Sequence, residues 1–451
     1  MKRQILVKMK PSELLIAFLL LLFLIGATFA YATEMRFSIQ KSCIIAYGFC
    51  VVYILFCLFN SKQSIFSPVM IIIHYLFVTG FGVPIAYLFA PEYTGMRLNR
   101  SKMFYGIYLD KYILISTVAL SSILLAVLLF SQTKRGCEVF LGDSFREGKN
   151  YYYEIGLFLL ISFAVYCVYG VLTRKIVLFS YSEYKAASNR LLGYLERGYW
   201  FGTIFACAAG TKKQIGYAIP WFLLGSIILL LAGNRNDIYF PMLIGMGLYV
   251  MRFAKLPRFL VIGVSSLILL SSPILILLRN NGEVTVSELS VFNLLGETFS
   301  ELGGQVCASS HMFRWLEQGD HYGMGICYVM GVIGSIFYPF HIGVETAISN
   351  AGYWIENRTV AIGFSMVAEV FYNFGIFGLG IVFFLIGLYL VIRERKVISD
   401  TDELVRTGFL YFWLLYLVRN YFGFSFTYAI MFYAVYFLEK VVRSLFEYQR
   451  R

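Results

Sequence analysis

Long apolar runs recur along the whole chain and are separated by shorter polar segments. Most runs reach roughly 20 residues with few charges, the length a helix needs to cross the hydrocarbon core of a bilayer. The pattern predicts an all-α polytopic membrane protein with about twelve transmembrane helices. We place them at residues 13–31, 42–60, 66–90, 111–130, 153–172, 196–210, 215–232, 237–253, 257–278, 361–391, 406–421 and 423–441. Because these runs continue from end to end, we expect residues 1–451 to form a single transmembrane domain.

Two of these helices depart from the common length. The helix at 196–210 is short and weakly apolar. The helix at 361–391 is longer than a perpendicular span needs, so we expect it to tilt or to begin in protein or water.

Composition and charge support a lipid-covered protein. The chain is 59% hydrophobic and only 14% charged, whereas a soluble protein carries about a quarter of charged residues. The net charge of +12 is typical of basic residues that anchor cytoplasmic loops, so we expect no nucleic-acid partner. The bias of Lys and Arg places both termini in the cytoplasm. The first apolar run, Leu14–Ala30, has no convincing cleavage site after it and is interpreted as a signal anchor.

The longest polar excursion, residues 279–360, is extracytoplasmic in this topology. It opens with apolar residues at steps of three and four, which predict an amphipathic helix lying on the bilayer or on other helices. The residues of this apolar face are Leu289, Phe292, Leu295, Phe299, Leu302 and Val306. The following segment Ile326–Phe340 is apolar but too short for a comfortable span, and we interpret it as re-entrant or buried.

Arginines gather on the predicted outer face. They are Arg97, Arg100, Arg174, Arg190, Arg197, Arg235, Arg279, Arg314, Arg358 and Arg419. A guanidinium binds phosphate oxygens bidentately and stays charged, although snorkelling to lipid headgroups explains those in the earlier loops equally well. Arg235 differs, because it follows Asn234 in a tight polar turn that opens a helix and offers backbone donors to an anion. The alternative is a capped turn in which Asp237 pairs with Arg235.

A second polar group opens the helix at 361–391. Ser365, Glu369 and Asn373 are spaced by four and therefore share one helix face. An ionisable residue inside a predicted span is costly unless it faces protein or a water-filled cavity. Function and structural pairing, for instance with an outer arginine, both require such a cavity, and the sequence leaves both open.

The remaining chemistry is sparse. His311, His321 and His341 lie in the large loop and could each act as a general base. The outer segments contain no DxD, ExD or HExxH motif, and the chain has no P-loop and no dinucleotide fingerprint. We therefore expect no metal and no cofactor, with the energy supplied by an activated substrate.

The second half of the chain resembles the O-antigen and capsule repeat-unit polymerases of the Wzy type. The resemblance rests on the polar turn Gly233-Asn234-Arg235, on His321-Tyr322-Gly323 followed by an apolar stretch and Pro339, and on Gly363-Phe364-Ser365, Glu369, Asn373-Phe374-Gly375 and Gly378.

The resemblance implies a GT-C-like glycosyltransferase in the bacterial cytoplasmic membrane. It would join undecaprenyl-diphosphate-linked repeat units into an O-antigen or capsule, with inversion and without a metal. Arg235 and Arg279 would hold the leaving diphosphate, with Arg314 and Arg358 as further candidates. Glu369, His321 or His311 would accept the proton. Asn234, Ser365 and Asn373 would support them.

The implied partners are the lipid-linked glycans, membrane lipid, and possible assembly partners in the form of a chain-length regulator and a flippase. Two other functions stay open at this point. An O-antigen ligase shares the architecture but uses another acceptor, and a lipid-linked glycan flippase or transporter would line a polar path through the full membrane depth.

Overall fold

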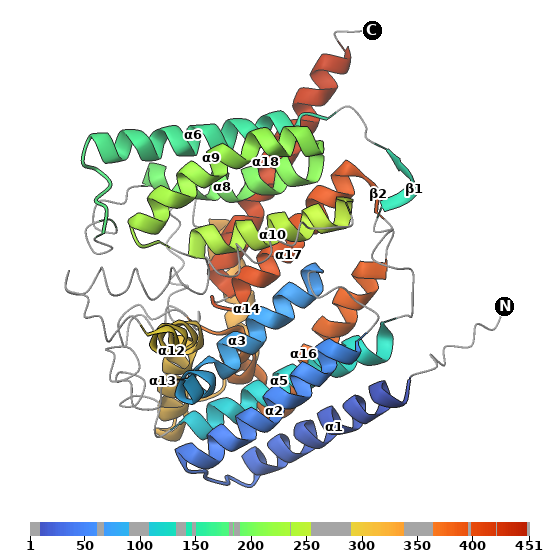
Figure 1. Ribbon diagram of the computed structural model, residues 1–451, viewed down its shortest axis with the longest axis vertical. Coiled ribbons are helices and arrows are strands. Elements are labelled where there is room, and N and C mark those ends of the chain that lie inside the picture. Colours follow the sequence, from blue (N-terminus) through green and yellow to red (C-terminus); the bar gives the residue numbers. More distant parts are fainter. Residues whose placement is uncertain are drawn as a thin grey trace, which may run out of the picture. The chain divides into compact units, whose positions relative to one another are not determined.

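The computed structural model describes residues 10–60, 67–89, 108–131, 141–146, 150–179, 184, 190–234, 236–253, 290–337, 364–395, 398–420 and 422–448. Within these ranges the chain is helical, as predicted, apart from two short strands (Figure 1). The strands β1 (Leu141–Arg146) and β2 (Ile398–Asp400) pair in parallel. The predicted helix at 257–278 lies outside the described residues.

Eight helices in the described part of the chain are long and apolar enough to cross a membrane. They are α1 (Pro11–Ala32), α2 (Ile39–Phe59), α3 (Pro68–Phe89), α5 (Leu109–Phe130), α6 (Tyr152–Leu172), α9 (Lys212–Leu231), α16 (Met366–Arg395) and α18 (Phe422–Tyr448). Each coincides with a predicted span.

The remaining helices are shorter or more polar. They are α8 (Arg190–Ala209), α10 (Asn236–Phe253), α12 (Val291–Leu302), α13 (Val306–Glu317), α14 (Ile326–Phe337) and α17 (Thr401–Leu417). Three of them, α8, α10 and α17, occupy predicted spans but are not among the eight apolar helices. The number of twelve spans therefore stays a prediction.

The helices group into two compact units. The first comprises Met1–Glu138, Leu295–Lys396 and Leu415–Thr427, and the second comprises Val139–Leu294, Val397–Leu414 and Tyr428–Arg451. The expectation of a single domain over residues 1–451 stays a prediction.

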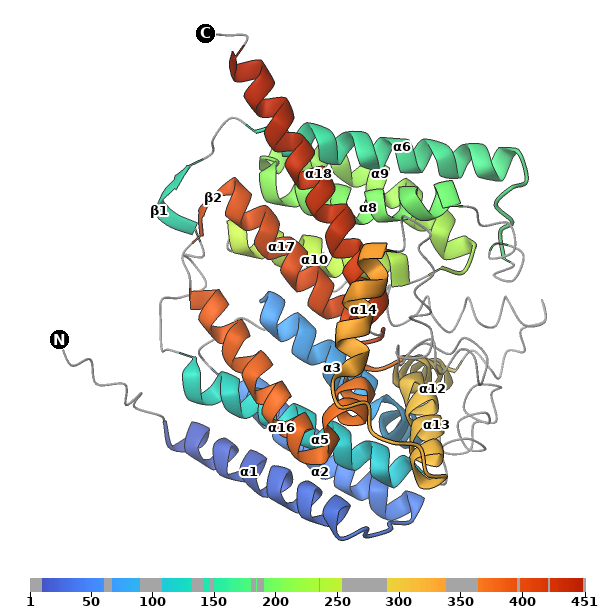
Figure 2. The ribbon, with the colours of Figure 1, turned by 180° about the vertical axis from the view of Figure 1, so that it is seen from behind.

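The first unit is built around α5, which is buried along almost its whole length. Helices α1 and α16 pack along it (Figure 2). Small residues allow the close approach: a Cβ added to Gly387 of α16 would stand 2.8 Å from the carbonyl oxygen of Ile123, and one added to Gly80 of α3 would meet Ser116 at 3.1 Å. Close backbone contact of this kind is how helices associate where lipid removes the hydrophobic driving force.

The second unit packs α6 against α8, with α9 and α10 alongside. Gly156 and Gly202 face each other so closely that a Cβ on either would stand about 2.8–2.9 Å from the opposite backbone. Phe409 stacks on Phe432 at 3.9 Å between ring centroids. At the start of α17 the Asp402 carboxylate accepts hydrogen bonds from Tyr152 and Lys440.

Candidate functional site

The start of α16 carries the polar face predicted from the spacing of four. Ser365, Glu369 and Asn373 are 1%, 2% and 0% exposed. Asn373 Nδ2 donates to the Glu369 carbonyl at 2.8 Å, so the side chains follow one side of the helix. A polar face buried this completely must find protein partners, because unpaired polar groups are costly away from water.

Gly375 separates this polar segment from the rest of α16. Its φ of 64° and ψ of −170° interrupt the helix, and a conformation of this kind is open essentially only to glycine. The part beyond it, residues 376–395, is about the length of one membrane span. The kink therefore explains why the apolar run at 361–391 is too long for a single perpendicular helix.

Glu369 is fixed by the start of α18. Its Oε2 accepts the Phe422 backbone N–H at 2.9 Å, and the Met366 N–H donates to the Val418 carbonyl at 3.4 Å. A carboxylate at a helix N-terminus is stabilised by the free N–H groups and the helix dipole. The short connection between α17 and α18 thus forms one wall around the Glu369 carboxylate.

Asn373 is fixed by the segment that precedes α14. Its Oδ1 accepts the Gly325 N–H at 3.1 Å, and the Gly323 N–H donates to the Tyr372 carbonyl at 3.0 Å. A Cβ at Gly323 would stand 2.8 Å from Asn373 Oδ1, so the contact requires glycine. The segment beginning at His321, which is exposed, is thereby tied to the polar start of α16.

Arg419 lies in the connection between α17 and α18, next to the residues that hold the Glu369 carboxylate. In the amide orientation that satisfies both groups, Gln305 Oε1 accepts from Arg419 Nε at 2.6 Å and Gln305 Nε2 donates to the Phe364 carbonyl at 3.1 Å. Arg419 also donates to the Tyr75 hydroxyl, and the charge of Glu301 acts on that hydroxyl. The sequence alone places Arg419 on the predicted outer face but gives it no special role, because its partners Tyr75 and Gln305 are far away in the chain.

The helices of the large loop turn a polar face inward. Glu297, Glu301, Gln305 and Ser309, again spaced by four, are 4%, 7%, 2% and 0% exposed, whereas Phe292 is 64% exposed. Helix α12 ends in a 3₁₀ turn, Gly303–Gln305, before α13 begins. The close approach of Gly303 to Gly82 of α3 leaves no room for a side chain, since a Cβ there would stand 2.6 Å from the Val83 nitrogen.

The sequence predicts an amphipathic helix whose apolar face lies on the bilayer or on other helices, and the choice between the two stays open. Of the predicted apolar face, only Val306 is fully buried in the described part of the chain, while the polar stripe beside it points into the protein. Hydrophobic periodicity assumes that the interior is apolar. The inward side of α12 carries Glu297 and Glu301, whereas α13 buries the apolar residues Met312 and Phe313.

Helix α13 is anchored at its end by Glu317. Its carboxylate pairs with Arg36 at 2.6 Å and Lys111 at 2.5 Å and accepts a hydrogen bond from Tyr108 at 2.7 Å. Burial raises the pKa of Glu317, but the bonds from Lys111, Tyr108 and Arg36 outweigh it and lower the pKa to about 2. The carboxylate is therefore charged at any physiological pH.

His311 and Arg314 lie on α13, one turn apart. His311 is half-buried beside Trp315, with 5.6 Å between ring centroids, and Arg314 is exposed. Burial, with a smaller contribution from Arg314, lowers the pKa of His311 below its usual value. The imidazole is therefore neutral near pH 7 and able to accept a proton.

The second unit contains the other predicted polar turn. Asn234 Nδ2 donates to Glu196 Oε1 at 3.4 Å and to Asp237 Oδ2, and the Tyr184 hydroxyl donates to Glu196. The fold thus brings the carboxyl groups of Glu196 and Asp237 around one amide, a pairing that no local motif in the sequence indicates. The structure of Arg235 itself lies outside the described residues.

Comparison with known proteins decides the family. The sequence profile of the O-antigen polysaccharide polymerase Wzy family matches residues 14–443. The chain belongs to this family. The polymerase is also similar to Protein CapE of Staphylococcus aureus, with 24% identity over 356 residues that cover 74% of this chain and 77% of that protein. No solved structure matches the chain described here.

Family membership fixes the general activity. The polymerase is a multi-pass membrane protein of glycosyltransferase type that joins lipid-linked oligosaccharide repeat units into a surface polysaccharide. The Wzy resemblance expected from the motifs of the second half is thereby confirmed.

The structure accounts for some of the predicted site residues and not for others. Glu369, Ser365, Asn373, His311, His321 and Arg314 all lie in the first unit of the polymerase. Arg279 and Arg358 lie outside the described residues, as does Arg235. Among the residues that are described, no group of three or more His, Cys, Asp or Glu is placed to hold a metal ion.

Proposed function

We propose that the polymerase transfers a growing glycan from undecaprenyl diphosphate to a repeat unit on a second carrier lipid at the outer face of the bacterial cytoplasmic membrane. The observation that carries the proposal is the buried face of Glu369 and Asn373, which is held between the His321 segment and the start of α18. Polar groups this deeply buried in a membrane helix mark functional sites by default.

The reaction is a direct displacement. A hydroxyl oxygen of the acceptor sugar forms a bond to the anomeric carbon of the donor while the bond from that carbon to the diphosphate oxygen breaks. The bonding pair leaves with the lipid diphosphate, and the hydroxyl proton passes to a protein base. Attack from the side opposite the leaving group inverts the anomeric centre. The energy comes from the glycosyl diphosphate, so the proposed reaction needs no metal.

Two kinds of side chain are candidates for the base. The Glu369 carboxylate is held in place by the Phe422 N–H, which leaves its orientation fixed. His311 is neutral near pH 7 because burial lowers its pKa. His321 is exposed on the segment tied to Asn373. We assign the role to Glu369, since a base must be oriented before its pKa matters.

Cations complete the site by stabilising the leaving diphosphate. Arg235, Arg279, Arg314 and Arg358 are the proposed set from the sequence. We add Arg419, whose guanidinium is held by Gln305 and Tyr75 beside the connection that binds Glu369. A guanidinium oriented in advance can stabilise developing charge without reorganising during the reaction.

The wider proposal concerns topology and partners. We propose about twelve spans with both termini in the cytoplasm, one membrane domain over residues 1–451, and residues 279–360 outside. A flippase would deliver the repeat units, and a chain-length regulator would set the length of the product.

A deletion strain complemented with variants tests the proposed site. The Arg235→Ala, Glu369→Ala double variant should leave single repeat units in place of a polymer ladder, with normal amounts of polymerase in the membrane. A normal ladder would overturn the site, and loss of all surface glycan with intact lipid-linked polymer would indicate ligation instead.

Purified enzyme with a lipid-linked repeat unit, stripped of divalent ions by a chelator, tests metal independence. NMR coupling constants of the new linkage test inversion.

A further inference from the structure

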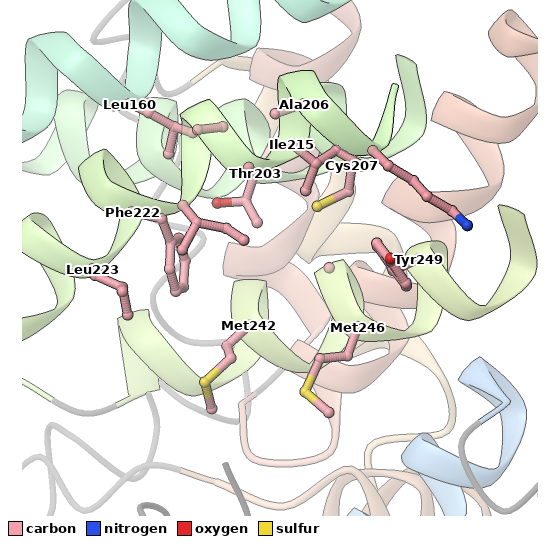
Figure 3. A pocket seen from close by; sticks show the side chains of 15 residues that line it. Leu160, Thr203, Ala206, Cys207, Ile215, Phe222, Leu223, Met242, Met246 and Tyr249 are labelled. Atoms are coloured by element: carbon pink, nitrogen blue, oxygen red, sulfur yellow. The ribbon is translucent and has the colours of Figure 1, made fainter. Parts of the chain in front are cut away.

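A cavity of about 370 Å³ lies in the second unit, and none of the residues that line it is among those assigned to catalysis (Figure 3). Thr203 and Cys207 of α8, Phe222 of α9, and Met246 and Tyr249 of α10 all point into it. Pockets of roughly 300–1,000 Å³ with mostly apolar walls are typical of ligand sites.

The cavity is elongated along α9. Its lining includes Lys212, the first residue of that helix, and extends to Leu223. Eleven residues of helix rise by about 16 Å, which is close to half of the roughly 30 Å hydrocarbon core. The cavity therefore has the length of one hydrocarbon chain in a single leaflet.

The two ends of the cavity differ in charge. Lys212 is the one charged side chain among the residues that line it, and its Nζ lies 5.2 Å from the centroid of the Phe253 ring. Arg252 lies nearby and donates to the carbonyls of Ala208 and Gly210 at 3.1 and 2.5 Å. The N-terminus of α9 adds its own partial positive charge. The far end, around Phe222 and Leu223, is apolar.

The rim of the cavity lies on an exposed, apolar side of α9. Helix α9 is long and apolar enough to span the membrane, and its rim residues Ile219 and Leu223 are 42% and 47% exposed. The two methionines of α10 that line the wall are flexible and adapt to an irregular chain. A ligand that enters from this side is itself a membrane component.

We propose that this cavity binds one acyl chain of an anionic phospholipid, with the lipid phosphate at Lys212. The charged end selects an anionic headgroup, because basic residues at the membrane surface attract such lipids. The apolar length excludes free phosphate and other small anions. Its lining shares no residue with the proposed catalytic set, so the two proposals can be tested independently.

Native mass spectrometry of the full-length polymerase tests the proposal, with phosphatidylglycerol and phosphatidylcholine of the same acyl chains as probes. The wild type should retain phosphatidylglycerol in preference. Lys212→Gln should reduce that preference about fivefold. Lys213→Gln, one residue further on and not part of the lining, should leave it unchanged.

A second variant tests the cavity rather than the charge. Gly216 lines it, and a Cβ there meets nothing within 4 Å, so Gly216→Leu should fold and fill the space. We expect it to lose both lipids. Gly26→Leu, in an equally open glycine position on α1, is the matched control and should keep the preference for phosphatidylglycerol. Equal binding of the two lipids by the wild type, no effect of Gly216→Leu, or displacement of phosphatidylglycerol by undecaprenyl phosphate would each overturn the assignment.

Discussion

The two polar constellations of the polymerase, one at the start of α16 and one around Asn234, are held in different ways. At the start of α16, Glu369 and Asn373 accept hydrogen bonds from backbone N–H groups of Phe422 and Gly325. Around Asn234, the partners are the side chains of Glu196 and Asp237. Backbone groups cannot be exchanged by mutation, whereas side chains can. The first constellation is thus fixed by the fold and the second by residue choice.

The difference bears on the role of each constellation. A carboxylate that is oriented by backbone donors, as Glu369 is, keeps its position when it accepts or releases a proton. An amide that lies between two carboxyl groups is already engaged, because its nitrogen donates to both of them. We therefore expect variants of the first constellation to fail in catalysis and variants of the second to fail mainly in stability.

The largest effect should come from Glu369→Gln. The amide oxygen still accepts the Phe422 N–H, so the fold persists, but the side chain no longer takes a proton. Loss of a general base costs about 10²–10⁴ in rate, measured with purified enzyme and a lipid-linked repeat unit. The control is Glu154→Gln, which changes an exposed carboxyl on α6 and should leave the rate unchanged. Near-normal activity of Glu369→Gln would move the role of base to His311 or His321.

Asn373→Ala comes next, because it removes the acceptor for the Gly325 N–H. A buried donor left unpaired costs about 1–3 kcal/mol, and the His321 segment should lose its register on α16. We expect about a tenfold fall in rate at normal membrane levels. Asn373→Asp keeps the acceptor and should recover part of the rate. If both variants are equally inactive, the side chain does more than hold this segment.

Much of the first constellation could be predicted from the sequence, since a spacing of four requires Ser365, Glu369 and Asn373 to share a face. Their role stays a prediction. The partners could not be predicted, because Gly325 and Phe422 are about fifty residues away and carry no side-chain signal.

The loop helix shows a different limit. The periodicity of apolar residues predicts a helix whether its apolar face is buried or exposed. Which face is buried depends on the residues against which the helix packs. In α12, Glu297 and Glu301 are buried and Phe292 is exposed. The long run at 361–391 was ambiguous for the same reason, and only the backbone angles of Gly375 divide it.

Asn234→Ala should have a smaller effect on catalysis than either variant of α16. Without the amide, Glu196 and Asp237 lose their shared hydrogen-bond donor, so the polymerase should unfold a few degrees earlier in a thermal melt, as expected for a loss of about 1–3 kcal/mol. At a permissive temperature the rate should stay close to that of the wild type. Asn234→Asp should be worse, because it adds a third acid. A loss of rate as large as that of Glu369→Gln, with an unchanged melting temperature, would place Asn234 in the reaction itself.

The smallest effect is expected from Glu317→Gln, at the end of helix α13, and it depends on pH. The pKa of Glu317 is lowered from 4.5 to about 2 by its hydrogen bonds to Lys111, Tyr108 and Arg36, which outweigh burial. A lowered pKa means that the carboxylate stabilises the fold fully above pH 4.5 and loses this contribution as the pH falls toward 2. Glu317→Gln should therefore melt slightly below the wild type at pH 7, and the gap should shrink steadily below pH 4.5. Because Glu317 is partly exposed, salt should narrow the gap at pH 7 as well. If the difference in melting temperature between the wild type and Glu317→Gln depends on neither pH nor salt, packing rather than charge holds α13 in place.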